Sequence, residues 1–209
     1  MAVLLLAGAT GLVGSEVLKL ALADPRIRRV VAPTRSPLPS HSGLENPITG
    51  FDCLNGGESW WRVDTVICAL GTTIKKAGSQ EAFRKVDHEF PLLVARYAKA
   101  QGARSYAFNS SVGANPDSGN FYLRTKGEAE RDLEACGFSS LTLVRPSVIG
   151  GRRQEPRPME RIAITLLEAV RPLVPRRYRV VSATRIARTL LESALAAIPG
   201  RKVIESEAI

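Results

Sequence analysis

The 209-residue sequence predicts a single α/β domain with a doubly wound parallel sheet and helices on both of its faces. Apolar, strand-like runs alternate with amphipathic helical stretches along most of the chain. The first of these runs, residues 3–7, has no polar position, as expected for a strand that is covered on both faces. A spaced-glycine turn joins it to the first helical stretch. These observations favour parallel strands joined by right-handed crossovers.

The expected elements follow one another as β–α units. Apolar runs predict strands at residues 3–7, 29–32, 65–70, 105–109, 141–144 and 202–205. Helical spacing and capping residues predict helices at residues 12–23, 80–100, 121–135, 159–170 and 183–197. A loop rich in Pro and Ser is expected from 33 to 47. Residues 145–180 interrupt the alternation, so we expect a small C-terminal substrate lobe there, within the one domain 1–209.

Three glycines lie in the turn after the first expected strand, which reads Gly8-Ala9-Thr10-Gly11-Leu12-Val13-Gly14. In this place one glycine permits the tight turn, the next lets the backbone approach a pyrophosphate, and Gly14 lets the helix pack close to the sheet. The helix N-terminus offers free N–H groups and the positive end of its dipole to phosphates. The turn therefore predicts a Rossmann-type dinucleotide site at Gly8, Thr10, Gly11, Leu12, Val13 and Gly14.

The end of the second expected strand indicates which dinucleotide is bound. A site that prefers NAD usually places Asp or Glu there, on the ribose hydroxyls. Here the residues are Ala32-Pro33-Thr34-Arg35-Ser36, with no carboxylate. The Arg35 guanidinium can pair with a 2′-phosphate through its fork of donors, and the alternative is a surface arginine without a ligand. The sequence therefore favours NADP(H) over NAD(H).

Tyr122 and Lys126 are four residues apart in an expected helix, so they share one face. A lysine ammonium favours the phenolate form of a nearby tyrosine and thereby suits it to acid–base catalysis. The preceding strand ends in Ser110 and Ser111, and a serine hydroxyl can donate to a substrate carbonyl oxygen as negative charge develops there. These residues predict a Ser-Tyr-Lys site. The alternative is a half-buried tyrosine beside a solvated lysine.

The sequence resembles the short-chain dehydrogenase/reductases in three motifs: Gly8-x-x-Gly11-x-x-Gly14, Ser110-Ser111 and Tyr122-x-x-x-Lys126. More narrowly, it is similar to an atypical, epimerase/dehydratase-like branch that binds NAD(P) and includes the human Tat-interacting oxidoreductase-like protein and its bacterial relatives. Further matches to this branch are Val86-Asp87, residues 110–114, Arg145-Pro146 and the arginine- and proline-rich run 153–160. The resemblance covers essentially the whole chain.

The resemblance implies roles for the site residues. Tyr122 is expected to give or take the proton, and Lys126 also to bind the nicotinamide ribose. Either Ser110 or Ser111 is the catalytic serine, with Ser111 favoured because related loops usually use the second. Ala69, Leu70, Gly71 and Thr72 are expected to run along the cofactor. Asp52 is expected to lie near the adenine, and Arg145, Ser147 and Val148 near the nicotinamide. Where many family members have a helix asparagine that takes part in a proton relay, this chain has Asp87, which departs from the family pattern.

The net charge of +9 is concentrated in one segment, because eleven arginines but three glutamates lie between Arg145 and Arg188. A basic segment can bind nucleic acid, but this one offers only Tyr178 for stacking bases, which argues against that function. An anionic ligand or a solvated arginine face explains the charge equally well. We expect Arg153 or Arg157 to lie near the open side of the site and to favour acidic or phosphorylated substrates.

Other classes of protein are excluded by composition. The three cysteines are widely spaced and the chain has two histidines, so neither a metal site nor a histidine-based triad is expected. No apolar run approaches the roughly 20 residues of a membrane span, and the apolar start lacks the basic flank of a signal peptide. We therefore expect a cytoplasmic protein with no metal and no membrane partner.

The sequence thus predicts an NADP(H)-dependent oxidoreductase that acts on a small carbonyl or alcohol substrate, anionic ones included, through a Ser-Tyr-Lys site. The alternative function is a redox-sensing regulatory protein that binds NADP(H) without turnover. Turnover of any carbonyl substrate distinguishes the two. The identity of the substrate and the oligomeric state, a homo-oligomer included, are left open by the sequence.

Overall fold

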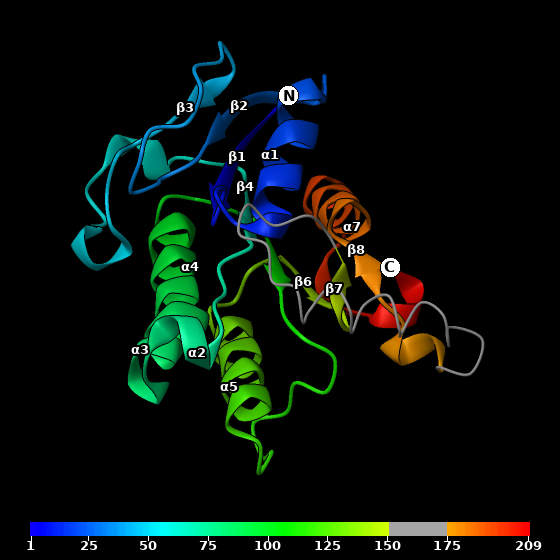
Figure 1. Cartoon of the computed structure of the whole chain (residues 1–209). Helices are drawn as coiled ribbons and strands as arrows, with labels where there is room; N and C mark the ends of the chain where they lie inside the picture. Colours follow the sequence, from blue (N-terminus) through cyan, green and yellow to red (C-terminus); the bar gives the residue numbers. More distant parts are fainter. Residues whose placement is uncertain (151–174) are drawn as a thin grey trace.

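The computed structural model describes residues 1–150 and 175–209, in which one parallel sheet is flanked by helices (Figure 1). Its strands are β1 Ala2–Ala7, β2 Ile27–Val31, β3 Leu44–Glu45, β4 Thr65–Cys68, β5 Ser105–Asn109, β6 Ser140–Arg145 and β9 Gly200–Glu205. These seven strands lie in the order β3-β2-β1-β4-β5-β6-β9, with every neighbouring pair parallel. The predicted doubly wound α/β fold is confirmed.

Helices cover both faces of the sheet. Helices α1 (Leu12–Ala23) and α7 (Ala183–Ala196) lie side by side on one face, and α4 (Phe90–Ala100) and α5 (Phe121–Ala135) lie on the other (Figure 1). The shorter helical segments are α2 Ile74–Ala77, α3 Gln80–Arg84, the π-helical turn η3 Lys85–Glu89 and the 3₁₀ turns η1 Phe51–Cys53, η2 Ser59–Trp61, η4 Arg176–Tyr178 and η5 Ser206–Ala208.

Strand β1 shows why its sequence is apolar at every position. Leu4 and Leu6 pack into the cluster under α1 and α7, whereas Val3 and Leu5 pack into the cluster on the α4 side. Successive side chains of a strand point to opposite faces, and here both faces are buried. A polar residue at any of these positions would lose its water without gaining a partner. The unbroken apolar run is therefore the signature of a central parallel strand.

The order in which strands are added to the sheet reverses between β1 and β4. Strands β2 and β3 lie on one side of this point, and β5, β6 and β9 lie on the other. Ligands of open α/β sheets bind at the carboxyl ends of the strands beside such a reversal. Gly8 lies there with φ of +92°, and a Cβ on it would come within 2.9 Å of the backbone of Ala69 and Leu70. A Cβ on Gly14 would lie 1.9 Å from the Gly8 carbonyl oxygen. Both positions therefore need glycine.

Two elements differ from the expectation. The expected loop 33–47 contains the two-residue strand β3, which pairs with β2 and is too short to give an alternating pattern. The expected continuous helix 80–100 is divided into α3, the π-helical turn η3 and α4, because the backbone inserts a wider turn at Lys85–Glu89. The six expected strands agree with the structure to within two residues at each end.

A second, two-stranded sheet pairs β7 (Ile149–Gly150) with β8 (Val181–Ser182) on either side of residues 151–174. The helix expected at 159–170 lies outside the described residues, and the substrate lobe at 145–180 stays a prediction. In residues 1–150 and 175–209, no helix is both long and apolar enough to cross a bilayer.

Candidate functional site

Helix α5 carries the two residues expected to transfer the proton. Its first turn is capped by Asn120, whose side-chain oxygen accepts a hydrogen bond from the Leu123 N–H across 3.2 Å. Tyr122 is partly exposed, and its ring centroid lies 5.6 Å from that of Phe83 in α3. Lys126, one turn further along, is 3% exposed. The tyrosine is thus partly accessible to solvent, whereas the lysine one turn away is buried.

The Lys126 ammonium is held by groups from two other elements. Its Nζ lies 2.9 Å from Oδ1 of Asp87, which comes from the turn η3. It also donates a long hydrogen bond of 3.4 Å to the carbonyl oxygen of Asn109, the last residue of β5. The other Asp87 oxygen, Oδ2, accepts a 2.8 Å hydrogen bond from the Thr72 N–H. The lysine is therefore tied to the carboxyl ends of both β4 and β5.

The electrostatic balance at Lys126 favours the charged form. Burial alone lowers the pKa of this ammonium, but the Asp87 carboxylate and the Tyr122 phenol outweigh burial, so the pKa lies above its ordinary value. An ammonium that stays charged across the neutral range can stabilise negative charge on the nearby tyrosine oxygen.

The loop after β5 distinguishes the two candidate serines. Ser110 is buried, and its hydroxyl donates to Oε1 of Glu130 across 2.5 Å. Ser111 is partly exposed, and its hydroxyl has only a 3.4 Å contact with the Val112 carbonyl oxygen. The loop then packs on the first turn of α5, where the Asn115 N–H donates to the Leu123 carbonyl oxygen across 3.1 Å. Ser111 is the hydroxyl that remains available to a ligand.

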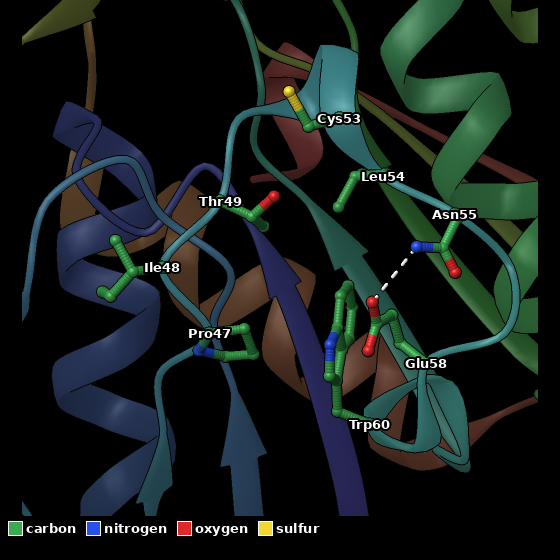
Figure 2. Close-up of a pocket in the computed structure, with 8 residues that line it drawn as sticks. All are labelled: Pro47, Ile48, Thr49, Cys53, Leu54, Asn55, Glu58 and Trp60. Atoms are coloured by element: carbon green, nitrogen blue, oxygen red, sulfur yellow. Dashed lines mark hydrogen bonds between the residues drawn. The ribbon is translucent and has the colours of Figure 1, made fainter.

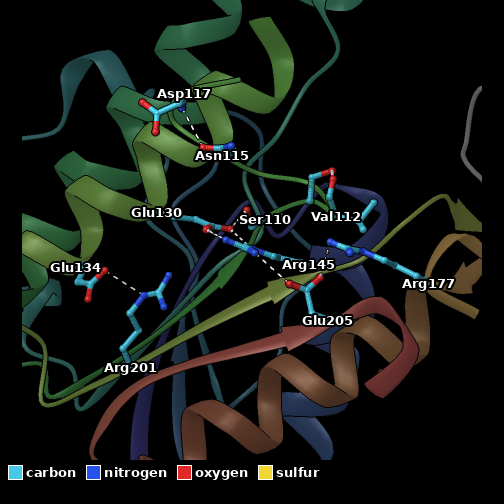
Figure 3. A network of polar contacts seen from close by, with 11 residues as sticks. Ser110, Val112, Asn115, Asp117, Glu130, Glu134, Arg145, Arg177, Arg201 and Glu205 are labelled. Carbon is cyan, nitrogen blue, oxygen red and sulfur yellow. Dashed lines mark hydrogen bonds and ion pairs between the residues drawn. The ribbon is translucent and has the colours of Figure 1, made fainter. Parts of the chain in front are cut away.

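A network of charges lies behind Ser110 (Figure 3). Glu130 of α5 is 3% exposed and is held by Arg145, whose Nε lies 2.9 Å from Oε1 and whose Nη2 lies 2.5 Å from Oε2. The third donor, Nη1 of Arg145, lies 3.0 Å from Glu205 at the end of β9, and Glu205 is 3.8 Å from Arg177. The Arg145 guanidinium, expected beside the cofactor, is thus engaged in joining three structural elements.

The loop after Arg145 is anchored as well. The Ser147 hydroxyl donates to the Arg179 carbonyl oxygen, and its N–H donates to the Ser206 hydroxyl across 3.2 Å. Val148 is 43% exposed at the following position. These residues, expected beside the nicotinamide, form a fixed backbone at the carboxyl end of β6. Their contact with a cofactor stays a prediction.

The glycine turn provides a cradle of the right chemistry for a dinucleotide. The Gly11 N–H donates to the Gly8 carbonyl oxygen across 2.9 Å, and α1 starts with no acidic residue in its first turn and no side-chain cap. Its first N–H groups are therefore left for an anion. On the other side of Gly8 lies the backbone of Ala69 and Leu70, so these two expected segments adjoin. The residues present fit a bound pyrophosphate.

Arg35 lies in a loop whose shape is set by a residue that sequence reasoning missed. The Asn46 amide donates to the Ala32 carbonyl oxygen and to the Thr34 hydroxyl, at 2.6 and 2.8 Å, and accepts from the Leu38 N–H at 2.8 Å. Arg35 itself is exposed, and within the described residues its side chain has no hydrogen bond or ion pair. The guanidinium is free to meet a phosphate at the end of β2.

Asp52, expected beside the adenine, is exposed in η1. The next residue, Cys53, lines a cavity of about 260 Å³, and Figure 2 shows the residues around this cavity. Three successive segments line this cavity: Pro47, Ile48 and Thr49; Cys53, Leu54 and Asn55; and Glu58 and Trp60. The first segment runs beside the Arg35 loop, since Ile48 forms a parallel bridge with Thr34. None of the expected catalytic residues lines this cavity. The candidate residues Arg153 and Arg157 lie outside the described residues.

Comparison with known sequences finds related proteins, although no family model matches the chain. "Protein fmp52, mitochondrial" of Aspergillus fumigatus is 38% identical over 170 residues, which cover 77% of this chain and 72% of that protein. "Protein FMP52, mitochondrial" of Candida albicans is 34% identical over 156 residues, which cover 71% and 67%. These relatives carry the Fmp52 name, not that of the Tat-interacting oxidoreductase-like protein.

The names of these relatives correct one expectation. The proteins from Aspergillus fumigatus, Candida albicans and Emericella nidulans are all named as mitochondrial, so the expectation of a cytoplasmic protein is wrong. That expectation rested on cysteine spacing, and the three cysteines are indeed free. Free thiols indicate a reducing environment but do not tell one reducing compartment from another.

Comparison with solved structures identifies the fold. "MoeE5 in complex with UDP-glucose and NAD" superposes with a TM-score of 0.74 at 19% identity, over 96% of this chain and 74% of that one. The UDP-N-acetylglucosamine 4-epimerase from Methanobrevibacter ruminantium gives 0.73 at 15%, over 98% and 76%. The Bordetella bronchiseptica enzyme WbmH, solved with NAD⁺, gives 0.71 at 15%, over 97% and 74%. The chain therefore has the Rossmann-like fold of these solved structures, two of which hold NAD.

Proposed function

The chain belongs to the Fmp52 family, and from this membership, the fold and the site together we propose that it is an NADP(H)-dependent oxidoreductase acting on a small carbonyl or alcohol. One observation carries the proposal: Tyr122 and a buried, charged Lys126 share a face of α5 and lie where β4 and β5 end. A buried ammonium beside a phenol is costly to maintain and is typical of a site of proton transfer.

In the reductive direction each side chain has one task. Ser111 donates a hydrogen bond to the carbonyl oxygen of the substrate and holds it near Tyr122. A nicotinamide held beside these residues would supply the hydride to the carbonyl carbon. Tyr122 gives its phenolic proton to this oxygen, which becomes the hydroxyl group of the alcohol product, and Lys126 stabilises the resulting phenolate. Oxidation of an alcohol uses the same groups in reverse.

The cofactor preference rests on Arg35. Its guanidinium is exposed and unpaired within the described residues, and it follows a strand with no carboxylate at its end. Such a group suits the 2′-phosphate that distinguishes NADP(H) from NAD(H). The turn 8–14 would hold the pyrophosphate, and residues 69–72 would lie along the cofactor. The motif at 110–114 further supports placing the chain in the atypical branch of the short-chain dehydrogenase/reductases.

The decisive experiment pairs binding with turnover. Tyr122→Phe should abolish NADPH-dependent reduction of a panel of small carbonyl compounds, acidic ones included, while NADPH binding measured by calorimetry stays nearly intact. Lys126→Ala should weaken both. Tyr97→Phe, which removes a hydroxyl from a ring packed on Trp61, is the matched control and should change neither. Full activity in Tyr122→Phe would show that the assigned acid is wrong.

The alternative function, a redox sensor without turnover, gives a different pattern in the same experiment. NADPH would bind to the parent protein, and no carbonyl in the panel would be reduced. The partly exposed Ser111 and Tyr122 favour the enzyme, because a sensor needs neither hydroxyl near a bound nicotinamide.

A further inference from the structure

Asp87 is nearly inaccessible to water, and each of its two carboxylate oxygens has a polar partner. Its side chain is 1% exposed and projects from the π-helical turn η3. Oδ1 lies 2.9 Å from the Lys126 ammonium, and Oδ2 accepts from the Thr72 N–H across 2.8 Å. A Cβ on Gly71 would lie 3.5 Å from Oδ1 and 3.9 Å from the lysine Nζ, so the ion pair lies directly behind the exposed end of β4.

The surroundings of Lys126 contain little else that could balance its charge. Tyr122 faces it from its own helix, the Cys68 thiol from β4, and the Asn109 carbonyl from β5. The Phe108 ring centroid is 5.0 Å from Nζ. Within residues 1–150 and 175–209, Asp87 supplies the carboxylate that forms an ion pair with this lysine. A buried ammonium without such a partner tends to lose its proton or to leave the site.

We propose that Asp87 is a positioning residue of the catalytic site, which keeps Lys126 as an ammonium behind Tyr122 and fixes it to the end of β4 through Thr72. The inference rests on the proposed function insofar as it assigns proton transfer to Tyr122 and Lys126. An asparagine in this place could accept one hydrogen bond but carries no charge to offset the ammonium. The aspartate therefore orients its neighbours and also keeps Lys126 positively charged.

The closing experiment measures stability rather than turnover, so it does not depend on finding a substrate. The free energy of unfolding of Asp87→Asn and of the parent is determined in urea from about pH 7 to about pH 10. In the parent the pKa of Lys126 is raised, so the folded state keeps its lysine proton in this range, and the unfolded chain begins to lose its own only near pH 10. In the variant, burial lowers the pKa of the folded-state lysine, so the unfolded chain binds more protons and stability rises with pH. The difference in free energy of unfolding between the parent and Asp87→Asn, the deficit of the variant, should therefore shrink as the pH rises.

A control and a second variant make the result unambiguous. Asp132 of α5 lies 2.8 Å from His88 Nε2 and 2.8 Å from Arg131 Nε and is paired with these groups rather than with a lysine, so the deficit of Asp132→Asn should stay constant. If Asp87→Asn does not fold, Asp87→Asn/Lys126→Met should fold, because it removes the unpaired charge as well. A deficit of Asp87→Asn that is independent of pH, or a double variant that also fails to fold, would overturn the proposal.

Where the parent reduces a carbonyl, the pH profile adds an independent readout. The alkaline limb of kcat should move to lower pH by about one unit in Asp87→Asn, since the lysine charge is lost earlier. A lower kcat with an unshifted profile would contradict the proposal. If the parent itself reduced no carbonyl compound, the result would count against the proposed function. The stability test of Asp87 would still apply, because it does not depend on turnover.

Discussion

The Ser110 hydroxyl donates to Glu130 across 2.5 Å, and Glu130 is itself clamped by Arg145. A hydroxyl already committed to a buried carboxylate is poorly placed to donate to a substrate. The neighbouring Ser111 has only a 3.4 Å contact with a backbone oxygen. The two adjacent serines therefore differ: Ser110 is engaged in the fold, and Ser111 is the one that we propose to act on the ligand.

Ser111→Ala should lower kcat by about 10²–10³-fold, because one donor to the developing oxyanion is lost. Its free energy of unfolding in urea should change little. The measurement is steady-state reduction at saturating NADPH, with the best substrate of the carbonyl panel.

Ser110→Ala is the matched control. It removes a hydrogen bond to a charged, buried group and should cost about 1–3 kcal/mol of stability, while kcat falls less than in Ser111→Ala. The opposite ranking of the two variants in kcat would assign the catalytic role to Ser110.

Arg35→Ala should remove most of the preference for NADPH. A tenfold tighter binding of NADPH than of NADH corresponds to about 1.4 kcal/mol, and the variant should bind the two cofactors about equally. Calorimetric titration of both cofactors measures the gap. Arg28→Ala, which alters an exposed arginine within β2, should leave the gap intact. Equal affinities in the parent would show that Arg35 does not read the 2′-phosphate.

Arg145→Met should destabilise the fold by about 3 kcal/mol, because it leaves the Glu130 carboxylate buried without its partner. Urea unfolding measures the loss. Glu130→Gln combined with Arg145→Met removes both charges and should recover part of it. A double variant less stable than Arg145→Met alone would mean that the buried charge is not the cause of the loss.

The sequence was sufficient where local chemistry determines the structure. Strand β1 is apolar at both faces, Gly14 is required by the Gly8 carbonyl oxygen in the same turn, and Gly8 has the positive φ that favours glycine. The spacing of Tyr122 and Lys126 needs only a helix to bring them to one face. These features were therefore predicted from sequence, and the structure has them as local consequences of residue type.

The sequence was insufficient where partners are far apart along the chain. Asp87 meets Lys126, Glu130 meets Arg145, and Asn46 reaches back to Ala32, and no periodicity signals such pairs. The Val86-Asp87 match drew attention to the aspartate, but its partner became known only from the fold. The two-residue strand β3 is likewise held by its pairing with β2 and by Asn46, not by its own propensity.

The close contact between α5 and the serine loop provides the last prediction. A Cβ on Gly127 would lie 2.2 Å from the backbone of Asn115 and Pro116, so Gly127→Ala must push the loop away from the helix. Alanine normally stabilises a helix interior relative to glycine, by about 0.5–1 kcal/mol, so a loss of stability here would have the opposite sign and point to the backbone contact.

Gly127→Ala should therefore unfold at lower urea concentration and reduce carbonyls more slowly, because Ser111 moves with the displaced loop. Gly119→Ala is the matched control: it lies in the same loop, and a Cβ there meets no atom within 4 Å. It should leave both stability and kcat unchanged. If Gly127→Ala were as stable as the parent but inactive, the loop would have moved without a net cost, and the role of the contact would be to place Ser111 alone. If it were both stable and fully active, the packing of the loop on α5 would not be what positions the serine.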